Sequence, residues 1–173
     1  MPQPERLVVF AHGKESGPWG TKITQLAEVA RRRGYAVSSP DYSHSHDPHE
    51  RIRLLQTLAP SATQALVLVG SSMGAYVSAM ACAALRPQAL FLMAPALYFP
   101  GWEEEPEGIP PLAAVVHGWN DDIVPPERGI RFAQRHRAML HLLDSGHGLN
   151  DQLPMLSLLF DDFLRRATTN HHE

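Results

Sequence analysis

At 173 residues the chain is long enough to bury one hydrophobic core and too short for two ordinary domains, so we expect a single domain over residues 1–173. A formal net charge of −3 at pH 7 offers no basic surface for nucleic acid or for an anionic membrane. The single cysteine, Cys82, excludes an internal disulfide, and the first residues lack the apolar stretch of a secretory signal. These features favour a cytoplasmic globular protein.

Short apolar runs alternate along the chain with longer amphipathic segments. The runs predict strands at 7–11, 35–39, 65–69, 89–93, 112–117 and 139–143, and the segments predict helices at 22–33, 49–58, 73–85, 127–136 and 152–166. Apolar strands that alternate with helices are typical of a parallel sheet covered by helices on both faces. The predicted fold is therefore a three-layer α/β/α sandwich with a mostly parallel sheet of about six strands.

The connection over 94–111 breaks this regular alternation. It is rich in proline and contains three consecutive glutamates at 103–105, so it cannot form a packed helical lid. We expect an extended surface loop. Its aromatic residues Tyr98, Phe99 and Trp102 could fold over a site or simply cover the edge of the sheet.

The stretch Gly70-Ser71-Ser72-Met73-Gly74 lies where the strand at 65–69 turns into the helix at 73–85. A G-x-S-x-G pattern at such a turn holds a serine in a strained backbone conformation, with its hydroxyl above the edge of the sheet. A Cβ atom at Gly70 or Gly74 would collide with the neighbouring strand or helix. The pattern predicts Ser72 as a nucleophile. The alternative is an ordinary Gly/Ser loop in which Ser72 caps the helix.

A serine hydroxyl needs a base to take its proton and an acidic residue to orient that base. Asp121 and Asp122 follow the predicted strand at 112–117, and His147 follows the strand at 139–143. Because the carboxyl ends of parallel strands meet at one edge of a sheet, we expect these side chains near Ser72. The chain order Ser, Asp, His is that of one hydrolase fold and differs from the chymotrypsin and subtilisin orders.

These motifs resemble those of the α/β-hydrolase superfamily over about residues 7–164. The matching segments are His12-Gly13 for the oxyanion segment, Gly70 to Gly74 for the nucleophile elbow, His117 to Pro125 for the acid motif H-G-x-x-D-x-x-V-P, and Gly146-His147-Gly148 for the histidine loop. Within the superfamily, Ser16, Pro18, Lys22 and Pro40-Asp41 make the chain similar to small cap-less bacterial serine esterases. The usual eight strands are reduced to about six, and no cap is inserted.

The resemblance implies a serine hydrolase that cleaves small or short-acyl carboxylic esters through Ser72, His147 and an aspartate, by way of an acyl-enzyme. The motif spacing favours Asp121 over Asp122 as that aspartate. The implied mechanism uses no cofactor and no metal ion, and its partner is a small-molecule ester. A thioesterase, an amidase or a perhydrolase would use the same residues, and a non-catalytic binding protein could keep the same fold.

The remaining predictions concern the oxyanion and the substrate. We expect the backbone N–H groups of Lys14 and Met73 to bind the oxyanion. The predicted pocket residues are Trp19, Tyr98, Phe99, Trp102 and Trp119. His12 is expected to order the oxyanion loop through a hydrogen bond.

Three further histidines, His44, His46 and His49, lie close together in the sequence around Asp47. This grouping could hold a metal ion, but it lacks the companion ligands of a structural zinc site. We expect it to be a solvent-exposed loop near the mouth of the site.

Overall fold

A computed structural model describes residues 2–169. One sheet contains the six strands of this part of the chain, in the order β2-β1-β3-β4-β5-β6, and all neighbours are parallel. The strands are β1 (Arg6–Ala11), β2 (Ala36–Ser38), β3 (Ala65–Ser71), β4 (Ala89–Met93), β5 (Leu112–Gly118) and β6 (Met139–Leu143). The α-helices are α1 (Thr21–Arg32), α2 (Pro48–Leu58), α3 (Met73–Leu85), α4 (Pro126–His136) and α5 (Leu153–Thr169).

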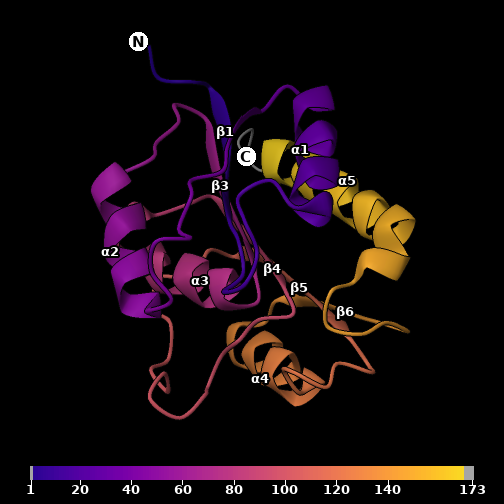
Figure 1. The fold of residues 1–173 in the computed structure, drawn as a ribbon. Coiled ribbons are helices and arrows are strands. Elements are labelled where there is room, and N and C mark those ends of the chain that lie inside the picture. The colour runs from indigo at the N-terminus through magenta and orange to yellow at the C-terminus, as the bar shows by residue number, and fades with distance from the viewer. Residues whose placement is uncertain (1, 170–173) are drawn as a thin grey trace.

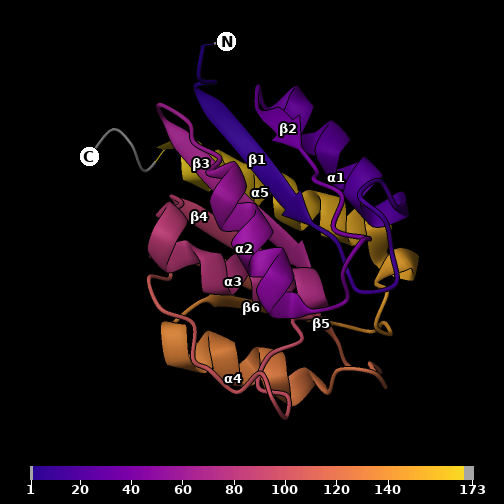
Figure 2. The same ribbon diagram turned by 60° about the vertical axis from the view of Figure 1, so that its left-hand side comes forward.

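The helices form two layers, one on each face of the sheet (Figures 1 and 2). Helices α1 and α5 pack together on one face, and α2, α3 and α4 cover the other. The predicted α/β/α sandwich is confirmed, because strands that are apolar on both faces need a helical layer on each side.

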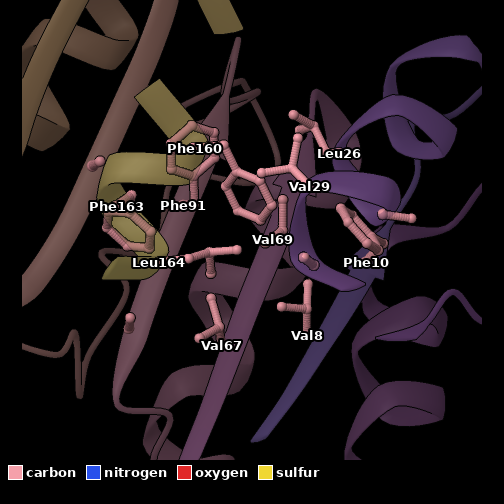
Figure 3. Packing of buried hydrophobic residues seen from close by; sticks show 14 of the residues in the cluster. Val8, Phe10, Leu26, Val29, Val67, Val69, Phe91, Phe160, Phe163 and Leu164 are labelled. Carbon is pink, nitrogen blue, oxygen red and sulfur yellow. The ribbon is translucent and has the colours of Figure 1, made fainter. Parts of the chain in front are cut away.

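Aromatic side chains fill the layer between the sheet and α5 (Figure 3). The ring of Phe91 on β4 lies 5.0 Å from that of Phe160 and 5.2 Å from that of Phe163, both on α5. Each of these side chains is buried, and burial of one such side chain contributes about 2 kcal/mol to folding. This packing fixes α5 across the central strands.

The main departure from the predicted elements is at β2. The sequence predicts a strand over 35–39, whereas β2 spans only Ala36–Ser38. The N–H of Tyr35 donates to the carbonyl oxygen of Ala30 in the last turn of α1, so Tyr35 belongs to the end of the helix. Gly34, between the end of α1 and Tyr35, has a positive φ of 81°, which favours glycine at that position.

The connection between β4 and β5 forms no helix and contains only an isolated bridge between Phe99 and Trp102. The expectation of an extended loop over 94–111 is confirmed, and no cap is inserted there. Among the described residues, no helix combines the length and the apolar character needed to cross a membrane.

Neighbouring strands end level at the carboxyl edge of the sheet, which positions the candidate site. Ala11 at the end of β1 lies opposite Gly70 of β3, and Gly118 at the end of β5 lies opposite Leu143 of β6. The segments that follow β1, β3, β5 and β6 therefore emerge at the same edge.

Candidate active site

Ser72 occupies the turn between β3 and α3, with a backbone φ of 56° and ψ of −118°. This strained conformation is kept because the elements on either side pack tightly. A Cβ atom built on Gly74 would overlap the backbone carbonyl of Ala11, and one built on Gly70 would overlap the backbone of Gly74 and Ala75. The two glycines thus let β1, β3 and α3 approach closely.

His147 lies in the loop after β6, and its imidazole connects two side chains from other elements. The Nε2 atom of His147 lies 2.9 Å from the Oγ atom of Ser72. The Nδ1 atom lies 2.7 Å from the Oδ2 atom of Asp121. The structure therefore brings together three residues from the loops after β3, β5 and β6.

The Asp121 side chain is fully buried, and hydrogen bonds reach both of its carboxylate oxygens. Oδ1 accepts the backbone N–H groups of Ile123, at 2.9 Å, and Val124, at 2.8 Å. Oδ2 lies beside His147 and also 3.1 Å from the Nε2 atom of His117. Asp122, the alternative in the sequence, is exposed to solvent. The geometry therefore supports Asp121 as the residue that faces His147.

His117 is a buried second histidine at Asp121, which the sequence analysis did not single out. Its Nε2 atom also lies 2.9 Å from the carbonyl oxygen of Val124, while its Nδ1 atom has no partner among the described residues. The hydrogen bond to Val124 fixes the position of this ring, which keeps its Nε2 atom in close contact with the Asp121 carboxylate.

This arrangement allows a proton to pass from the Ser72 hydroxyl to Nε2 of His147, while the Nδ1–H group donates to Asp121. The Asp121 carboxylate fixes the tautomer of the imidazole and stabilises its protonated form. Such a geometry suits attack by a serine oxygen on an acyl carbon.

The loop after β1 lies beside Ser72 and contains the predicted oxyanion residue Lys14. Lys14 and Met73 line the same cavity as Ser72, and the backbone N–H groups of these two residues donate to no other group within residues 2–169. Met73 is the first residue of α3, where the N–H groups have no partner inside the helix. Both amides are free to bind an anion that forms beside Ser72.

His12 shapes this loop, as the sequence analysis expected. Its Nδ1 atom lies 2.8 Å from the carbonyl oxygen of Gly13, and its Nε2 atom accepts the N–H group of Tyr42 at 2.9 Å. Burial lowers the pKa of His12 below its usual value, which agrees with a neutral ring that both donates and accepts.

Arg51 of α2 is the residue at this loop that sequence reasoning missed. It is 1% exposed, and its guanidinium donates to the carbonyl oxygens of His12 at 3.1 Å, Gly13 at 3.0 Å and Lys14 at 3.3 Å. In a trans peptide the N–H points away from the C=O, so fixing the Gly13 carbonyl fixes the direction of the Lys14 N–H. The helical spacing in the sequence contained an indication of this role, because Arg51 lies on the same face of α2 as the buried residues Ile52 and Leu55.

A cavity of about 770 Å³ opens over Ser72 and His147. Its size is within the range of small-molecule sites. Apolar side chains dominate its wall, among them Ile23, Phe99, Trp102 and Ile123. Two of the predicted pocket residues, Phe99 and Trp102, line it.

The other three predicted pocket residues, Trp19, Tyr98 and Trp119, are not among the residues that line this cavity. Tyr98 is buried against α4, where the Arg131 guanidinium lies 3.8 Å from its ring and its hydroxyl donates to Glu105. Trp19 and Trp119 are about half exposed, at 47% and 57%. Sequence position placed them near the site, but the direction of each side chain depends on the path of its loop.

Lys22, in the first turn of α1, also lines the cavity. Its Nζ atom donates to the carbonyl oxygen of Gly148 at 3.1 Å. Burial lowers the pKa of Lys22 to about 8, against a smaller opposing effect of the Asp121 carboxylate. A partly buried amine therefore lies next to the histidine loop.

The histidines of the 44–49 segment do not gather into a metal site. His44 and His46 are exposed, and the Nδ1 atom of His49 lies 3.5 Å from Asp47, the residue that caps α2. Across residues 2–169, no three His, Cys, Asp or Glu side chains are placed to hold a metal ion.

Comparison with solved structures gives close matches to this fold. A protein from Xanthomonas campestris pv. campestris assigned to the α/β-hydrolase superfamily is 33% identical, with a TM-score of 0.84, over 93% of this chain and 99% of that chain. A serine hydrolase without a lid from Xanthomonas campestris is 24% identical, with a TM-score of 0.69, over 95% and 83%. Est1E from Butyrivibrio proteoclasticus, with bound ferulic acid, is 18% identical, with a TM-score of 0.79, over 96% and 90%. The last two likenesses show the fold alone.

Among curated proteins, none matches the sequence. The model of the alpha/beta hydrolase family, however, matches residues 8–169, which is nearly all of the described chain. With this match, and with the Xanthomonas structure at 33% identity, the chain belongs to the α/β-hydrolase family, which supports a general hydrolase function for it.

Proposed function

We propose that this protein is a serine hydrolase that cleaves small or short-acyl carboxylic esters through an acyl-enzyme. The observation that carries the proposal is the hydrogen-bonded series from Ser72 Oγ through His147 to the buried Asp121 carboxylate, at the wall of a cavity. A buried acid, an oriented imidazole and a strained serine together serve nucleophilic catalysis rather than stability.

In the first half of the reaction, Ser72 Oγ bonds to the acyl carbon while its proton passes to Nε2 of His147. The carbonyl oxygen becomes an oxyanion, which the N–H groups of Lys14 and Met73 bind. Loss of one such donor typically lowers the rate by about 100- to 1000-fold. The tetrahedral intermediate then expels the alcohol, which takes the proton from His147, and leaves the acyl group on Ser72.

In the second half, His147 takes a proton from water as the water oxygen bonds to the acyl carbon. The bond to Ser72 Oγ then breaks, and His147 returns the proton to that oxygen. The products are the free acid and the original enzyme. Asp121 stays ionised in both halves and stabilises the imidazolium through Nδ1–H.

Labelling with a fluorophosphonate probe tests this proposal, because the probe reacts with an activated serine. We expect the wild-type protein to be labelled at Ser72 and to hydrolyse para-nitrophenyl butyrate. Ser72→Ala should lose both properties. Ser71→Ala is the matched control, because Ser71 is the adjacent buried serine, and it should keep the label.

Equal labelling of the wild-type protein and Ser72→Ala would contradict the proposed nucleophile. No labelling and no ester turnover in the wild-type protein would favour a non-catalytic binding protein with the same fold.

A further inference from the structure

The Lys22 amine is a partly buried cation at the cavity wall without a paired carboxylate. Its Nζ atom donates to the Gly148 carbonyl oxygen, and no carboxylate within residues 2–169 forms an ion pair with it. One carbonyl satisfies only one of the three ammonium N–H groups. The remaining N–H groups of this partly exposed amine are therefore available to water or to a ligand.

The charged groups nearby do not neutralise Lys22. The Asp121 carboxylate raises the pKa of the amine, but its oxygens already accept from His147 and from backbone N–H groups. Lys14 and Glu15 also line the cavity, and both are exposed, which leaves them to water. The first turn of α1, which presents Lys22, contains no acidic residue.

The cavity combines the Lys22 cation with a largely apolar wall that includes Ile23, Phe99 and Ile123. A ligand that matches both features has an apolar body and one anionic end. Neutral esters leave the ammonium group without an anionic partner, whereas a carboxylate forms a charge-assisted hydrogen bond with it.

We propose that Lys22 binds a carboxylate on the substrate, so that the enzyme prefers esters with one anionic end. This inference rests on the proposed esterase function. The carboxylate could belong to the acyl group or to the alcohol, and Nζ lies beside Gly148, next to the histidine that protonates the alcohol.

Two matched pairs of esters distinguish these positions. Para-nitrophenyl hydrogen adipate and para-nitrophenyl hexanoate differ by a carboxylate on the acyl side. Para-acetoxybenzoate and para-acetoxybenzamide differ by a carboxylate on the alcohol side. For each pair, kcat/KM of the anionic ester is divided by kcat/KM of the neutral ester. Comparison of this ratio between wild type and variant cancels the difference in intrinsic reactivity between the two esters.

We expect Lys22→Met to lower the anionic-to-neutral ratio by about 10-fold or more in one pair, because the anionic ester loses more of its kcat/KM than the neutral ester does. Lys22→Arg should retain the anionic preference. Arg53→Met is the control for loss of one positive charge, because Arg53 is an exposed residue of α2, and it should leave both ratios unchanged. An equal loss on both esters would overturn the inference, since it would show that Lys22 only holds the histidine loop.

Calorimetric titration with benzoate and with the neutral benzamide gives a readout that does not require turnover. Benzoate should bind the Ser72→Ala protein at least about 10-fold more weakly when Lys22 is also replaced by Met, and benzamide binding should not change. Equal affinity for benzoate in the Ser72→Ala protein with and without Lys22→Met would overturn the inference. If the wild-type protein hydrolyses neutral esters but Lys22→Met changes neither ratio, the anion site is rejected and the proposed function stands. If Ser72 is not labelled, the proposed function itself is rejected.

Discussion

At the scale of single residues, the site contains two buried or partly buried cations with different surroundings. Arg51 donates to backbone carbonyl oxygens on the side of the loop away from the cavity, and Lys22 lines the cavity itself. The planar guanidinium of Arg51 has enough donors to satisfy several fixed acceptors at once. The Lys22 ammonium keeps donors available to a ligand.

The pKa of Lys22 determines how the proposed anionic preference depends on pH. Burial lowers this pKa to about 8, so the amine is a cation below pH 8 and neutral above it. We expect the anionic-to-neutral ratio of kcat/KM to be highest near pH 6.5 to 7 and to fall as the pH rises through about 8 to 9. A bound carboxylate raises the pKa and moves the fall upward.

Measurement of both members of an ester pair from pH 6.5 to 10 checks this expectation. The other charged groups that face Lys22 are Lys14, Glu15, Asp121 and His147. Asp121 and His147 affect turnover of both esters, so their effects largely cancel in the ratio, and the Lys22→Arg curve reports any effect of Lys14 and Glu15. Lys22→Arg should give a ratio that is flat across the range. A wild-type ratio that is also flat would contradict the assignment.

At the scale of elements, the site depends on close contacts between segments that are distant in the sequence. Gly74 lets α3 approach the end of β1, and Arg51 of α2 holds the loop that follows β1. Two backbone hydrogen bonds, from Trp119 to Leu143 and from Asn120 to Ser145, join the loops after β5 and β6. Each loop of the site is thus fixed by a neighbouring element.

The contact between α2 and the oxyanion loop predicts a large effect of Arg51→Met. The variant leaves several buried carbonyl oxygens without a donor, so the free energy of unfolding should fall by about 3 kcal/mol. In the fraction that remains folded, kcat for para-nitrophenyl butyrate should fall by about 100-fold, with KM changed much less, because the Lys14 N–H loses its direction.

Urea unfolding and steady-state kinetics, corrected for the labelled fraction, measure these two effects. Arg53→Met on the exposed face of the same helix should leave both quantities near wild type. A loss of stability with kcat unchanged would assign Arg51 a purely structural role.

At the scale of the whole molecule, the sheet is reduced to six parallel strands and the connection over 94–111 forms no helical cap. Glu103 and Glu104 of this connection are exposed, whereas Glu105 contacts His136 and accepts from the Tyr98 hydroxyl. The cavity over Ser72 is bounded by loops together with the first turn of α1 and the start of α3, and a long acyl chain would leave much of its length exposed.

This architecture predicts the dependence of activity on acyl length. We expect kcat/KM for para-nitrophenyl esters to fall from the acetyl or butyryl ester towards the palmitoyl ester, because methylene groups that stay in water add no binding energy. Assays across the series at a fixed detergent concentration measure this trend. A steady rise to the longest chain would require an apolar tunnel that the open site lacks.

The sequence by itself determined the features that depend on local patterns. Apolar runs marked the six strands because strands buried on both faces have no polar side. The glycines of the turn at Ser72 indicated that backbone segments pack closely there. The polar residues that follow β5 and β6 indicated at which edge of the sheet the candidate site lies. The functions of these residues remain predictions that the experiments above test.

Only the tertiary structure decided the features that depend on where loops and helix faces meet. The motif spacing already favoured Asp121 over Asp122, but only the structure showed how the backbone N–H groups of the loop after β5 orient that carboxylate against His147. The structure also turned Tyr98 towards α4 and Lys22 into the cavity. The direction of such a side chain follows from packing between distant segments, which no local pattern of residues contains.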